Sequence, residues 1–182
     1  DKHGYCSLGT SIDVPLSALK SAKKVLAQIN PKVPRSHGDG IIHQSQIDAA
    51  IEVDEPLYQS KIVEPSDKEI EIGKHVASLV EDGACLQMGI GGIPNVVLKQ
   101  LTNHKNLGVH TEMFSDGIIP LVENGTINGS KKYLKTGKIV SCFAMGSQKL
   151  YDFIDDNPSI HMKEAAYTNR TGLIAMNKKV TA

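Results

Sequence analysis

The sequence predicts an α/β fold with mainly parallel sheets. Short apolar runs of strand length alternate with segments of helical periodicity, as they do in successive β-α units. At residues 85–101 a glycine turn joins a strand to a helix, an arrangement typical of parallel sheets. Hydrophobic residues make up 40% of the 182-residue chain, aromatic residues only 4%, and Trp is absent. That composition suits an aliphatic core between a sheet and its helices.

The first part of the chain starts with a predicted β-α-β unit. A helix that tolerates Pro15 in its first turn lies between two apolar runs. Such a connection implies that the two flanking strands lie parallel in one sheet. The elements expected here are a strand at residues 5–8, a helix at 11–23, a strand at 25–29, a loop at 31–40 and a strand at 51–53.

A boundary between two units is predicted at residues 59–65. This stretch shows neither strand nor helix periodicity, and a helix start follows it directly. The chain therefore divides into residues 1–58, a linker, and residues 66–182.

The second unit opens with a capping box. Ser66 is followed three residues later by Glu69, and the apolar residues Ile72 and Val76 then recur at helical spacing. The alternation continues beyond the glycine turn. The elements expected there are a helix at residues 94–101, a strand at 107–110, a helix at 116–124, a strand at 139–144, a helix at 147–154 and a strand at 159–162.

Both ends of the chain resemble cut points. Asp1 leads almost directly into a strand, and no closing helix is predicted around residues 173–177. We therefore expect the chain to be an internal fragment of a longer protein.

Charge and cysteine content argue against several classes of protein. Lys plus Arg and Asp plus Glu number 20 each, so no bulk charge favours binding of nucleic acid. Neither a secretory signal nor an apolar run of membrane-spanning length is visible, and we expect a protein of the cytoplasm or of an organelle matrix. The apolar surroundings of the three cysteines predict buried, reduced thiols at Cys6, Cys85 and Cys142.

A glycine turn forms the first half of a candidate site. Gly89, Gly91 and Gly92 follow an apolar strand and precede a helix. Without side chains they let a ligand approach the backbone, and the helix N-terminus adds partial positive charge. The next strand runs toward Glu112. Because parallel strands end at one edge of a sheet, we expect backbone N–H groups and a carboxylate to meet there.

Three interpretations fit this pattern. The turn could be a tight connection that binds nothing. It could hold a dinucleotide, because Gly89 and Gly91 match the start of a Rossmann fingerprint and Glu112 lies where a ribose-binding acid belongs, although Pro94 occupies the third glycine position. In the third interpretation Glu112 is a nucleophile toward a thioester, and backbone N–H groups of the turn form its oxyanion hole.

Five ordered blocks give the sequence a resemblance to a known family. Along essentially its whole length it is similar to the acetyl-CoA hydrolase/transferase family of class I CoA-transferases, above all to the 4-hydroxybutyrate and butyrate:acetate CoA-transferases. The blocks are residues 1–11 (DKHGYCSLGTS), 34–39 (PRSHGD), 89–94 (GIGGIP), 110–117 (HTEMFSDG) and 138–146 (KIVSCFAMG).

The resemblance implies two similar CoA-transferase-type α/β domains with the active site between them. Residues 1–58 would close the first domain, and residues 66–182 would open the second. The catalytic glutamate of the family falls on Glu112, and the oxyanion hole and coenzyme contact fall on the glycine turn. One position departs from the pattern, because Val96 stands where a small residue is expected.

The resemblance also implies the activity, an acyl-CoA:carboxylate CoA-transferase of the 4-hydroxybutyrate, butyrate or acetate type. The reaction would run through an acyl-glutamyl anhydride and a glutamyl-CoA thioester on Glu112, with acetyl-CoA hydrolysis as the alternative. Coenzyme A would act as a substrate, with no permanently bound cofactor and no metal. The implied partners are acyl-CoA and small carboxylates, without nucleic acid or membrane, in a homo-oligomer.

Four further polar residues have two possible roles each. Glu123 precedes Asn-Gly, as the glutamate of related transferases does, and is either a rival nucleophile or the polar end of a helix. Asp116 caps the following helix or lines the pocket. His37 and Asp39 contact the acyl group or the coenzyme, or they belong to a polar turn.

The remaining candidates are basic. His110 shares a strand with the approach to Glu112, and we expect it to be a structural residue with satisfied hydrogen bonds. Three lysines form a cluster that could meet coenzyme phosphates, although a solvated surface is the simpler interpretation. They are Lys131, Lys132 and Lys135.

Overall fold

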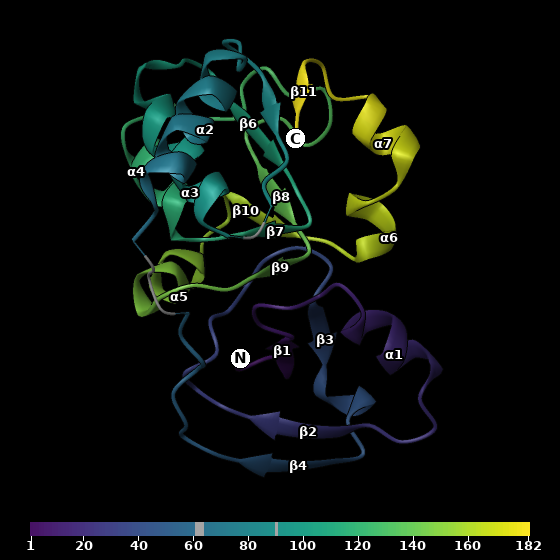
Figure 1. Cartoon of the computed structure of the whole chain (residues 1–182). Helices are drawn as coiled ribbons and strands as arrows, with labels where there is room; N and C mark the ends of the chain where they lie inside the picture. The colour runs from purple at the N-terminus through teal and green to yellow at the C-terminus, as the bar shows by residue number, and fades with distance from the viewer. Residues whose placement is uncertain (61–63, 90) are drawn as a thin grey trace.

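The computed structural model describes residues 1–60, 64–89 and 91–182. Figure 1 shows a larger upper lobe that contains most of the helices and a smaller lower lobe that contains β1 to β4 and α1. Among the described residues, the upper lobe is built on a parallel sheet with the strand order β10-β8-β6-β5-β11. Its strands are β5 (Cys85–Leu86), β6 (Gly108–His110), β8 (Ile139–Ser141), β10 (Ile160–Met162) and β11 (Val180–Thr181).

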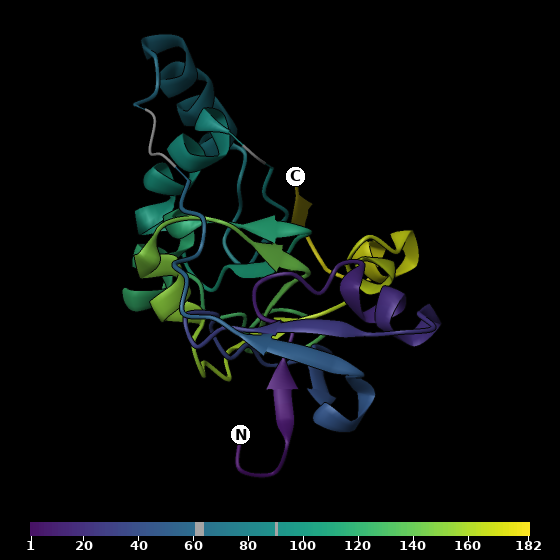
Figure 2. The ribbon, with the colours of Figure 1, turned by 90° about the horizontal axis from the view of Figure 1, so that it is seen from below.

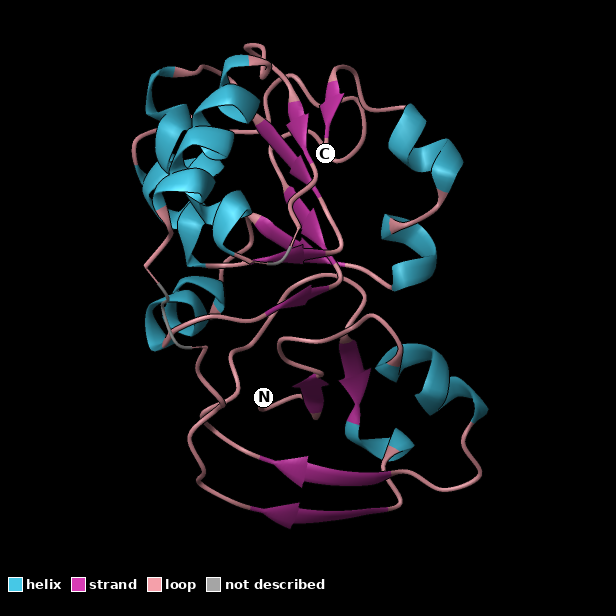
Figure 3. Cartoon of the chain, viewed as in Figure 1, coloured by secondary structure: helices cyan, strands magenta, loops and turns pink. Residues whose placement is uncertain are grey.

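The prediction of an α/β fold with mainly parallel sheets is confirmed. One side of the large sheet is covered by the helices α2 to α5, and α6 and α7 lie on its other side (Figure 3). The helices are α2 (Asp67–Ser78), α3 (Gly92–Gln100), α4 (Ile119–Glu123), α5 (Gln148–Ile154), α6 (Ala165–Thr168) and α7 (Thr171–Ala175), with short 3-10 turns at Leu101–Asn103 and Asp116–Ile118.

Most of the core lies between the large sheet and the helices α2 to α5, and the same cluster continues into the smaller lobe through Ile12, Leu16 and Ile42. Its members are aliphatic with the exception of Phe114, in agreement with the low aromatic content. Burial of this apolar surface supplies most of the driving force for folding of the lobe. The fully buried residues of the core include Leu101, Leu107, Val109, Phe114, Ile118, Ile119, Leu150, Ile154, Ile160 and Met162.

The capping box at the start of α2 forms as expected. The Glu69 N–H donates to the Ser66 side chain, and the Ser66 N–H donates to the Glu69 carboxylate at 2.7 Å. The same carboxylate lies close to Gly92 at the start of α3, since a Cβ added at Gly92 would be 2.5 Å from Glu69 Oε1. The box therefore lies directly against the first turn of the next helix.

The predicted β-α-β unit in the first part of the chain is wrong. β1 (Tyr5–Ser7) pairs antiparallel with β3 (Ile41–His43), whereas β2 (Leu26–Ile29) pairs parallel with β4 (Ala49–Glu52). The two strands on either side of α1 therefore belong to different sheets (Figure 2). The partner of β1 is a three-residue strand directly after the predicted loop, at residues for which no element was predicted, and it is too short to show a period.

The first helix is also shorter than expected. α1 covers Pro15–Ser21 instead of residues 11–23. Residues ahead of it pair with the other lobe: Ser11 bridges Phe143, and the Ile12 N–H donates to the Cys142 carbonyl at 2.8 Å. The backbone of Ser11 and Ile12 therefore pairs with residues of the other lobe instead of joining the helix.

The strand expected at residues 139–144 is broken at Cys142. β8 ends at Ser141, and β9 (Phe143–Ala144) pairs with β7 (Met113–Phe114) in a separate two-stranded sheet. The chain bends in the same way after β6, so the two corners lie side by side. The expectation of no closing helix near residues 173–177 is wrong as well, because α7 covers Thr171–Ala175 and β11 follows it.

Residues 37–39 join the smaller lobe to the edge of the large sheet. Met162 N–H donates to the His37 carbonyl and Asp39 N–H donates to the Met162 carbonyl, both at 2.8 Å. The linker predicted at residues 59–65 is only partly described, because residues 61–63 lie outside the described residues. Its first part lies against α5, where Ser60 N–H donates to the Gly146 carbonyl at 3.0 Å. The division into two domains stays a prediction.

None of the helices in the described parts of the chain combines the length and the apolar character needed to cross a membrane.

Candidate functional site

The site lies where the parallel strands of the large sheet end. β5 leads into Gly89 and β6 leads into Glu112, and these two strands are direct neighbours with Leu86 paired to Val109. Parallel strands deliver such residues to one edge of a sheet. We call this edge, formed by the C-terminal ends of β5, β6, β8 and β10, the carboxyl edge. The structure thus brings the glycine turn and Glu112 to adjacent strand ends.

Glu112 occupies the corner between β6 and β7, and its side chain is exposed. Its backbone carbonyl, in contrast, accepts several hydrogen bonds from the neighbouring corner. The donors are the N–H groups of Cys142 (3.0 Å) and Phe143 (3.1 Å), the hydroxyl of Ser141 (2.9 Å) and the thiol of Cys142 (3.1 Å). The backbone of the residue is held firmly, while its carboxylate is left accessible for chemistry.

The three glycines of the turn have different structural reasons to be glycine. Gly91 has φ 121° and ψ −170°, a conformation that residues with a Cβ essentially do not adopt. Gly92 allows the close approach of Glu69 described above. Gly89 has neither constraint, because an added Cβ would only make an ordinary 3.6 Å contact with Pro94.

Gly91 is the N-cap of α3, and no side chain among the described residues caps this helix. The N–H groups of a first helical turn lack acceptors within the helix. Those of Gly92 and Ile93 therefore belong to the part of the turn that can offer donors to a negative group. The arrangement fits either an anion or the oxyanion of an acyl-transfer reaction.

Val96, the one departure from the family pattern, packs against a glycine. A Cβ added at Gly73 of α2 would lie 2.4 Å from Val96 Cγ1. The larger side chain on α3 is thus matched by the absence of one on α2, and the two helices keep a close contact.

The three possible pocket residues all have protein partners. His37 Nε2 lies 3.0 Å from the Asp156 carboxylate, and the Asp39 carboxylate accepts from Lys163 Nζ at 2.6 Å. The Asp116 carboxylate accepts the N–H of Ser147 at 2.9 Å and also its hydroxyl. Asp116 therefore caps α5, a helix farther along the chain, instead of the helix that follows it. Their part in ligand binding stays a prediction.

Comparison with known proteins identifies the chain. The models of the acetyl-CoA hydrolase/transferase N-terminal and C-terminal domains match residues 1–64 and 146–182. The chain belongs to the acetyl-CoA hydrolase/transferase family. It is 47% identical over its whole length to a succinyl-CoA:acetate/propanoyl-CoA:succinate CoA transferase of Fasciola hepatica and 47% identical to a 4-hydroxybutyrate coenzyme A transferase of Clostridium kluyveri. It spans 38% and 42% of the length of these two relatives.

Solved structures agree with this family. The 4-hydroxybutyrate CoA-transferase of Porphyromonas gingivalis superposes with a TM-score of 0.94 at 43% identity, over 99% of this chain and 46% of that one. RipA of Yersinia pestis superposes with a TM-score of 0.96 at 36% identity, over 99% of this chain and 42% of that one. The fold of the chain is therefore that of the family over all of its described length.

Glu123, the rival nucleophile, lies away from the carboxyl edge. It ends α4, beside Gly125 and Ile127, and Ile127 forms a bridge with Leu107 just ahead of β6. This places it near the opposite edge of the sheet, formed by the N-terminal ends of the strands, which we call the amino edge. Its carboxylate lies 3.9 Å from Lys149 Nζ.

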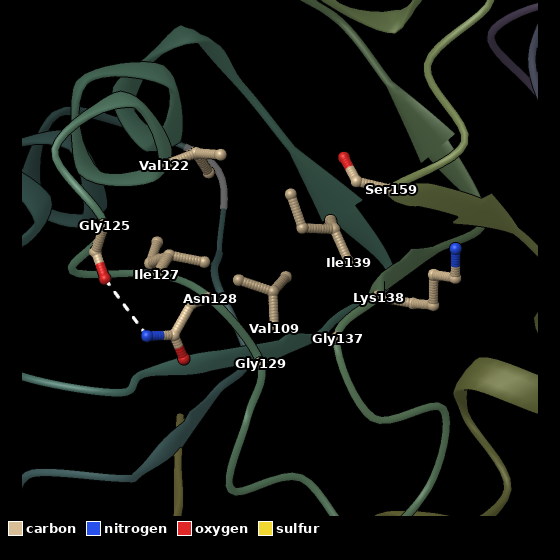
Figure 4. Close-up of a pocket in the computed structure, with 10 residues that line it drawn as sticks. All are labelled: Val109, Val122, Gly125, Ile127, Asn128, Gly129, Gly137, Lys138, Ile139 and Ser159. Atoms are coloured by element: carbon tan, nitrogen blue, oxygen red, sulfur yellow. Dashed lines mark hydrogen bonds between the residues drawn. The ribbon is translucent and has the colours of Figure 1, made fainter.

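A pocket of about 260 Å³ opens at the amino edge (Figure 4). Apolar side chains line much of it, and glycine backbone and three polar residues complete the wall. The lining residues are Val109, Val122, Gly125, Ile127, Asn128, Gly129, Gly137, Lys138, Ile139 and Ser159. None of the predicted site residues lines it. Its apolar walls and its position on the far edge separate it from the chemistry expected at Glu112.

The solvated interpretation of the lysine cluster is wrong for Lys132. This side chain is only 6% exposed, and its ammonium donates to the carbonyl oxygens of Val109 (2.6 Å) and Lys138 (2.7 Å). Lys131 and Lys135 are exposed, as expected. Nothing in the periodicity of residues 129–138 distinguishes the buried lysine from its neighbours.

His110 is a buried structural residue, and one of its two ring nitrogens is hydrogen-bonded. It is buried, its Nε2–H donates to the Thr168 carbonyl at 2.9 Å, and its ring stacks on Tyr167. Burial lowers its pKa and favours the neutral ring. Among the described residues Nδ1 has no hydrogen-bond partner, so the expectation of a satisfied histidine holds for only one of its two nitrogens.

Sequence reasoning missed the groups that hold the corner at Glu112. Ser141 and Cys142 lie in an apolar run and were expected only to pack in a strand. The sequence pattern likewise assigns no role to Thr111 beside Glu112. A signal was present: each is a polar residue at the end of an otherwise apolar strand, where the backbone needs new partners once the ladder stops.

Proposed function

We propose that the complete protein is an acyl-CoA:carboxylate CoA-transferase and that Glu112 is its nucleophile. The observation that supports this most directly is the pairing of an exposed carboxylate on a fixed backbone corner with a glycine turn on the adjacent strand end. Membership of the family supplies the reaction class, and the names of the relatives supply the substrate class, CoA thioesters and carboxylates.

In the proposed reaction, the Glu112 carboxylate attacks the carbonyl carbon of an acyl-CoA and the CoA thiolate leaves, giving an acyl-glutamyl anhydride. The thiolate then attacks the glutamyl carbonyl and releases the acyl group as a carboxylate, giving a glutamyl-CoA thioester. A second carboxylate reverses these steps. Both tetrahedral intermediates carry negative charge, which the N–H groups of the turn from Gly91 to Ile93 are suited to stabilise.

This sequence of steps needs no metal and no redox cofactor. Coenzyme A enters and leaves as part of the substrates, so no permanently bound group is proposed. Assembly into a homo-oligomer and a location in the cytoplasm or an organelle matrix belong to the same proposal.

A covalent trap tests the proposal. The complete protein is incubated with acetyl-CoA, treated with borohydride and digested. The masses of the peptides are then measured by mass spectrometry. A glutamyl thioester on Glu112 is reduced to an alcohol, and Glu112→Gln removes both this change and at least about 10³-fold of the transferase activity. Glu123→Gln is the matched control and retains both. An unmodified Glu112, or full activity in Glu112→Gln, contradicts the assignment.

Hydrolysis of acetyl-CoA is the second candidate function. A relative from Kluyveromyces lactis, 33% identical over 65% of this chain, is an acetyl-CoA hydrolase, and water that reached the glutamyl thioester would hydrolyse it. The two functions differ in their dependence on an acceptor. A transferase exchanges labelled acetate into acyl-CoA and releases little free thiol without a carboxylate, whereas a hydrolase releases thiol at the same rate in both conditions.

A further inference from the structure

We propose that the hydroxyl of Thr111 is a positioning group that fixes Glu112 relative to the glycine turn. The proposal rests on the proposed function, because it concerns the distance between the nucleophile and the oxyanion donors. Thr111 itself does not face the substrate: it is 1% exposed.

The hydroxyl of Thr111 contacts the backbone on both sides of the site. Its oxygen accepts the N–H of Met88 at 3.0 Å, and it lies 3.1 Å from the Met88 carbonyl and 2.9 Å from the Met113 carbonyl. Its single proton can serve either carbonyl. Met88 directly precedes Gly89, and Met113 directly follows Glu112. One buried atom therefore connects the segments that carry the oxyanion donors and the nucleophile.

This connection replaces a sheet ladder that has already ended. The last paired residues of β5 and β6 are Leu86 and Val109. Beyond them the Gln87 N–H donates to the Thr181 carbonyl on the other side of β5, at 2.9 Å. In the described part of the chain, the Thr111 hydroxyl is a buried contact that holds Met88 to the β6 corner beyond the end of this ladder.

Among the described residues, the other hydrogen bonds at the corner do not reach Met88 at the start of the glycine turn. The bonds to the Glu112 carbonyl come from Ser141, Cys142 and Phe143, and they fix Glu112 to the β8–β9 corner instead. Ser115 reaches Asn95 of α3 at 3.1 Å, but this bond is exposed. Loss of the Thr111 hydroxyl should therefore change the position of the glycine turn relative to Glu112 and leave the corner itself in place.

Thr111→Val removes the hydroxyl and keeps the shape of the side chain. It leaves the Met88 N–H and the two carbonyls to find other partners, and a shift of about 1 Å between reacting groups costs roughly 10²-fold in rate. We expect kcat to fall about 30- to 100-fold, while KM for acyl-CoA stays within about threefold because binding contacts elsewhere are unchanged. Thr111→Ser keeps the hydroxyl and is the matched control, with kcat within about threefold of the wild type.

The experiment measures kcat, KM and the single-turnover rate of the borohydride-trapped thioester on Glu112 in the complete protein, with melting temperatures for each variant. Slow trapping in Thr111→Val, rescued in Thr111→Ser, supports the positioning role. A Thr111→Val enzyme as fast as the wild type overturns it, and so does a Thr111→Ser enzyme as slow as Thr111→Val. If Thr111→Val does not fold, Thr111→Ala takes its place with the same expectations.

The two proposals fail in different ways. A wild-type protein without acyl exchange and without a trapped thioester overturns the proposed function and the role of Thr111 together. Normal wild-type chemistry combined with an unaffected Thr111→Val overturns the role of Thr111 alone.

Discussion

The two edges of the large sheet each carry an ionisable side chain, and the two side chains differ in exposure and in hydrogen bonding. At the carboxyl edge, the backbone of Glu112 accepts the hydrogen bonds and its charged side chain stays exposed. At the amino edge, Lys132 is buried and its charged side chain itself makes the hydrogen bonds, to the carbonyls of Val109 and Lys138. The first arrangement keeps a side chain available for reaction, whereas the second uses one to fasten a loop.

The electrostatic consequences follow the same division. Burial lowers the pKa of Lys132 to about 8 and raises the pKa of the Cys85 thiol to about 11. Both groups therefore favour their neutral forms more than they do in water. The exposed carboxylate of Glu112 and the uncapped start of α3 lie instead at the carboxyl edge.

After replacement of Glu112 itself, the largest expected effect comes from the glycine turn. Gly91→Ala meets no atom within 4 Å of the new Cβ, but it forces alanine toward φ 121°, which costs about 1–3 kcal/mol or reorients the peptide. Since loss of an oxyanion donor lowers kcat about 10²- to 10³-fold, we expect at least a 10²-fold fall in kcat. Steady-state kinetics and a melting curve measure both effects.

The matched control for this change lies at the amino edge. Gly125 also has a positive φ, 81°, and an added Cβ there also meets nothing within 4 Å. Gly125→Ala should lower stability by about 1 kcal/mol and leave kcat unchanged. Equal losses of kcat in the two variants would mean that the edges do not differ in function.

A smaller effect is expected at Asp116, whose carboxylate lies near the carboxyl edge and stabilises the start of α5. Asp116→Ala removes the acceptor for the N–H and hydroxyl of Ser147 at the start of α5. We expect about 2 kcal/mol of destabilisation, measured by urea unfolding of the complete protein. Asp152→Ala, on the exposed side of the same helix, should change stability by less than about 0.5 kcal/mol. A tenfold loss of kcat at unchanged stability would instead make Asp116 a pocket residue.

The smallest effect is a pH dependence at the amino edge. Native Lys132 releases its proton near pH 8, whereas an unfolded lysine keeps it to about 10.5. The unfolded state therefore binds more protons between these values, and stability rises with pH across them. From pH 7 to pH 9 the wild type should gain about 1 kcal/mol relative to Lys132→Met, measured by urea unfolding at both values.

The titration of Cys85 and a control at Lys131 bear on the interpretation of this pH dependence. The Cys85 thiol acts in the opposite direction, because its native pKa is raised, but only above its ordinary value of 9. Lys131→Met, at the exposed neighbouring position, is the control and should show the pH profile of the wild type. A Lys132→Met profile parallel to that of the wild type would show that the ammonium is not buried in solution.

Local patterns were sufficient for much of the large sheet. The Ser66–Glu69 capping box starts α2 as expected. The alternation of apolar runs placed β6 and β10 within one residue and the start of β8 correctly, although the predicted strand continued through the corner to residue 144. The order of strand, glycine turn, helix and strand also placed the glycines and Glu112 at neighbouring strand ends. These features depend on residues close together in the sequence, so hydrophobic periodicity and the residue types of turns are enough to predict them.

Other features depended on which distant segments meet. β1 pairs with β3 because residues 41–43 return to it, and α1 is short because Ser11 and Ile12 bond to the β8–β9 corner. Asp116 finds its partner 31 residues along the chain. None of these pairings changes a local period, and so none was visible in the sequence.

The sequence by itself thus determined the α/β class, the alternation of strands and helices along the second unit, and the parallel direction of its strands. It also determined which carboxylate, that of Glu112, lies beside the glycine turn. Only the tertiary structure decided that the backbone of Glu112 is held by a second corner, that Thr111 connects it to Met88, and that Lys132 is buried while Lys131 is not. The physical reason is that burial and hydrogen bonding beyond the end of a ladder are properties of assembled segments. A strand end leaves N–H and carbonyl groups that need partners, and only the fold chooses them.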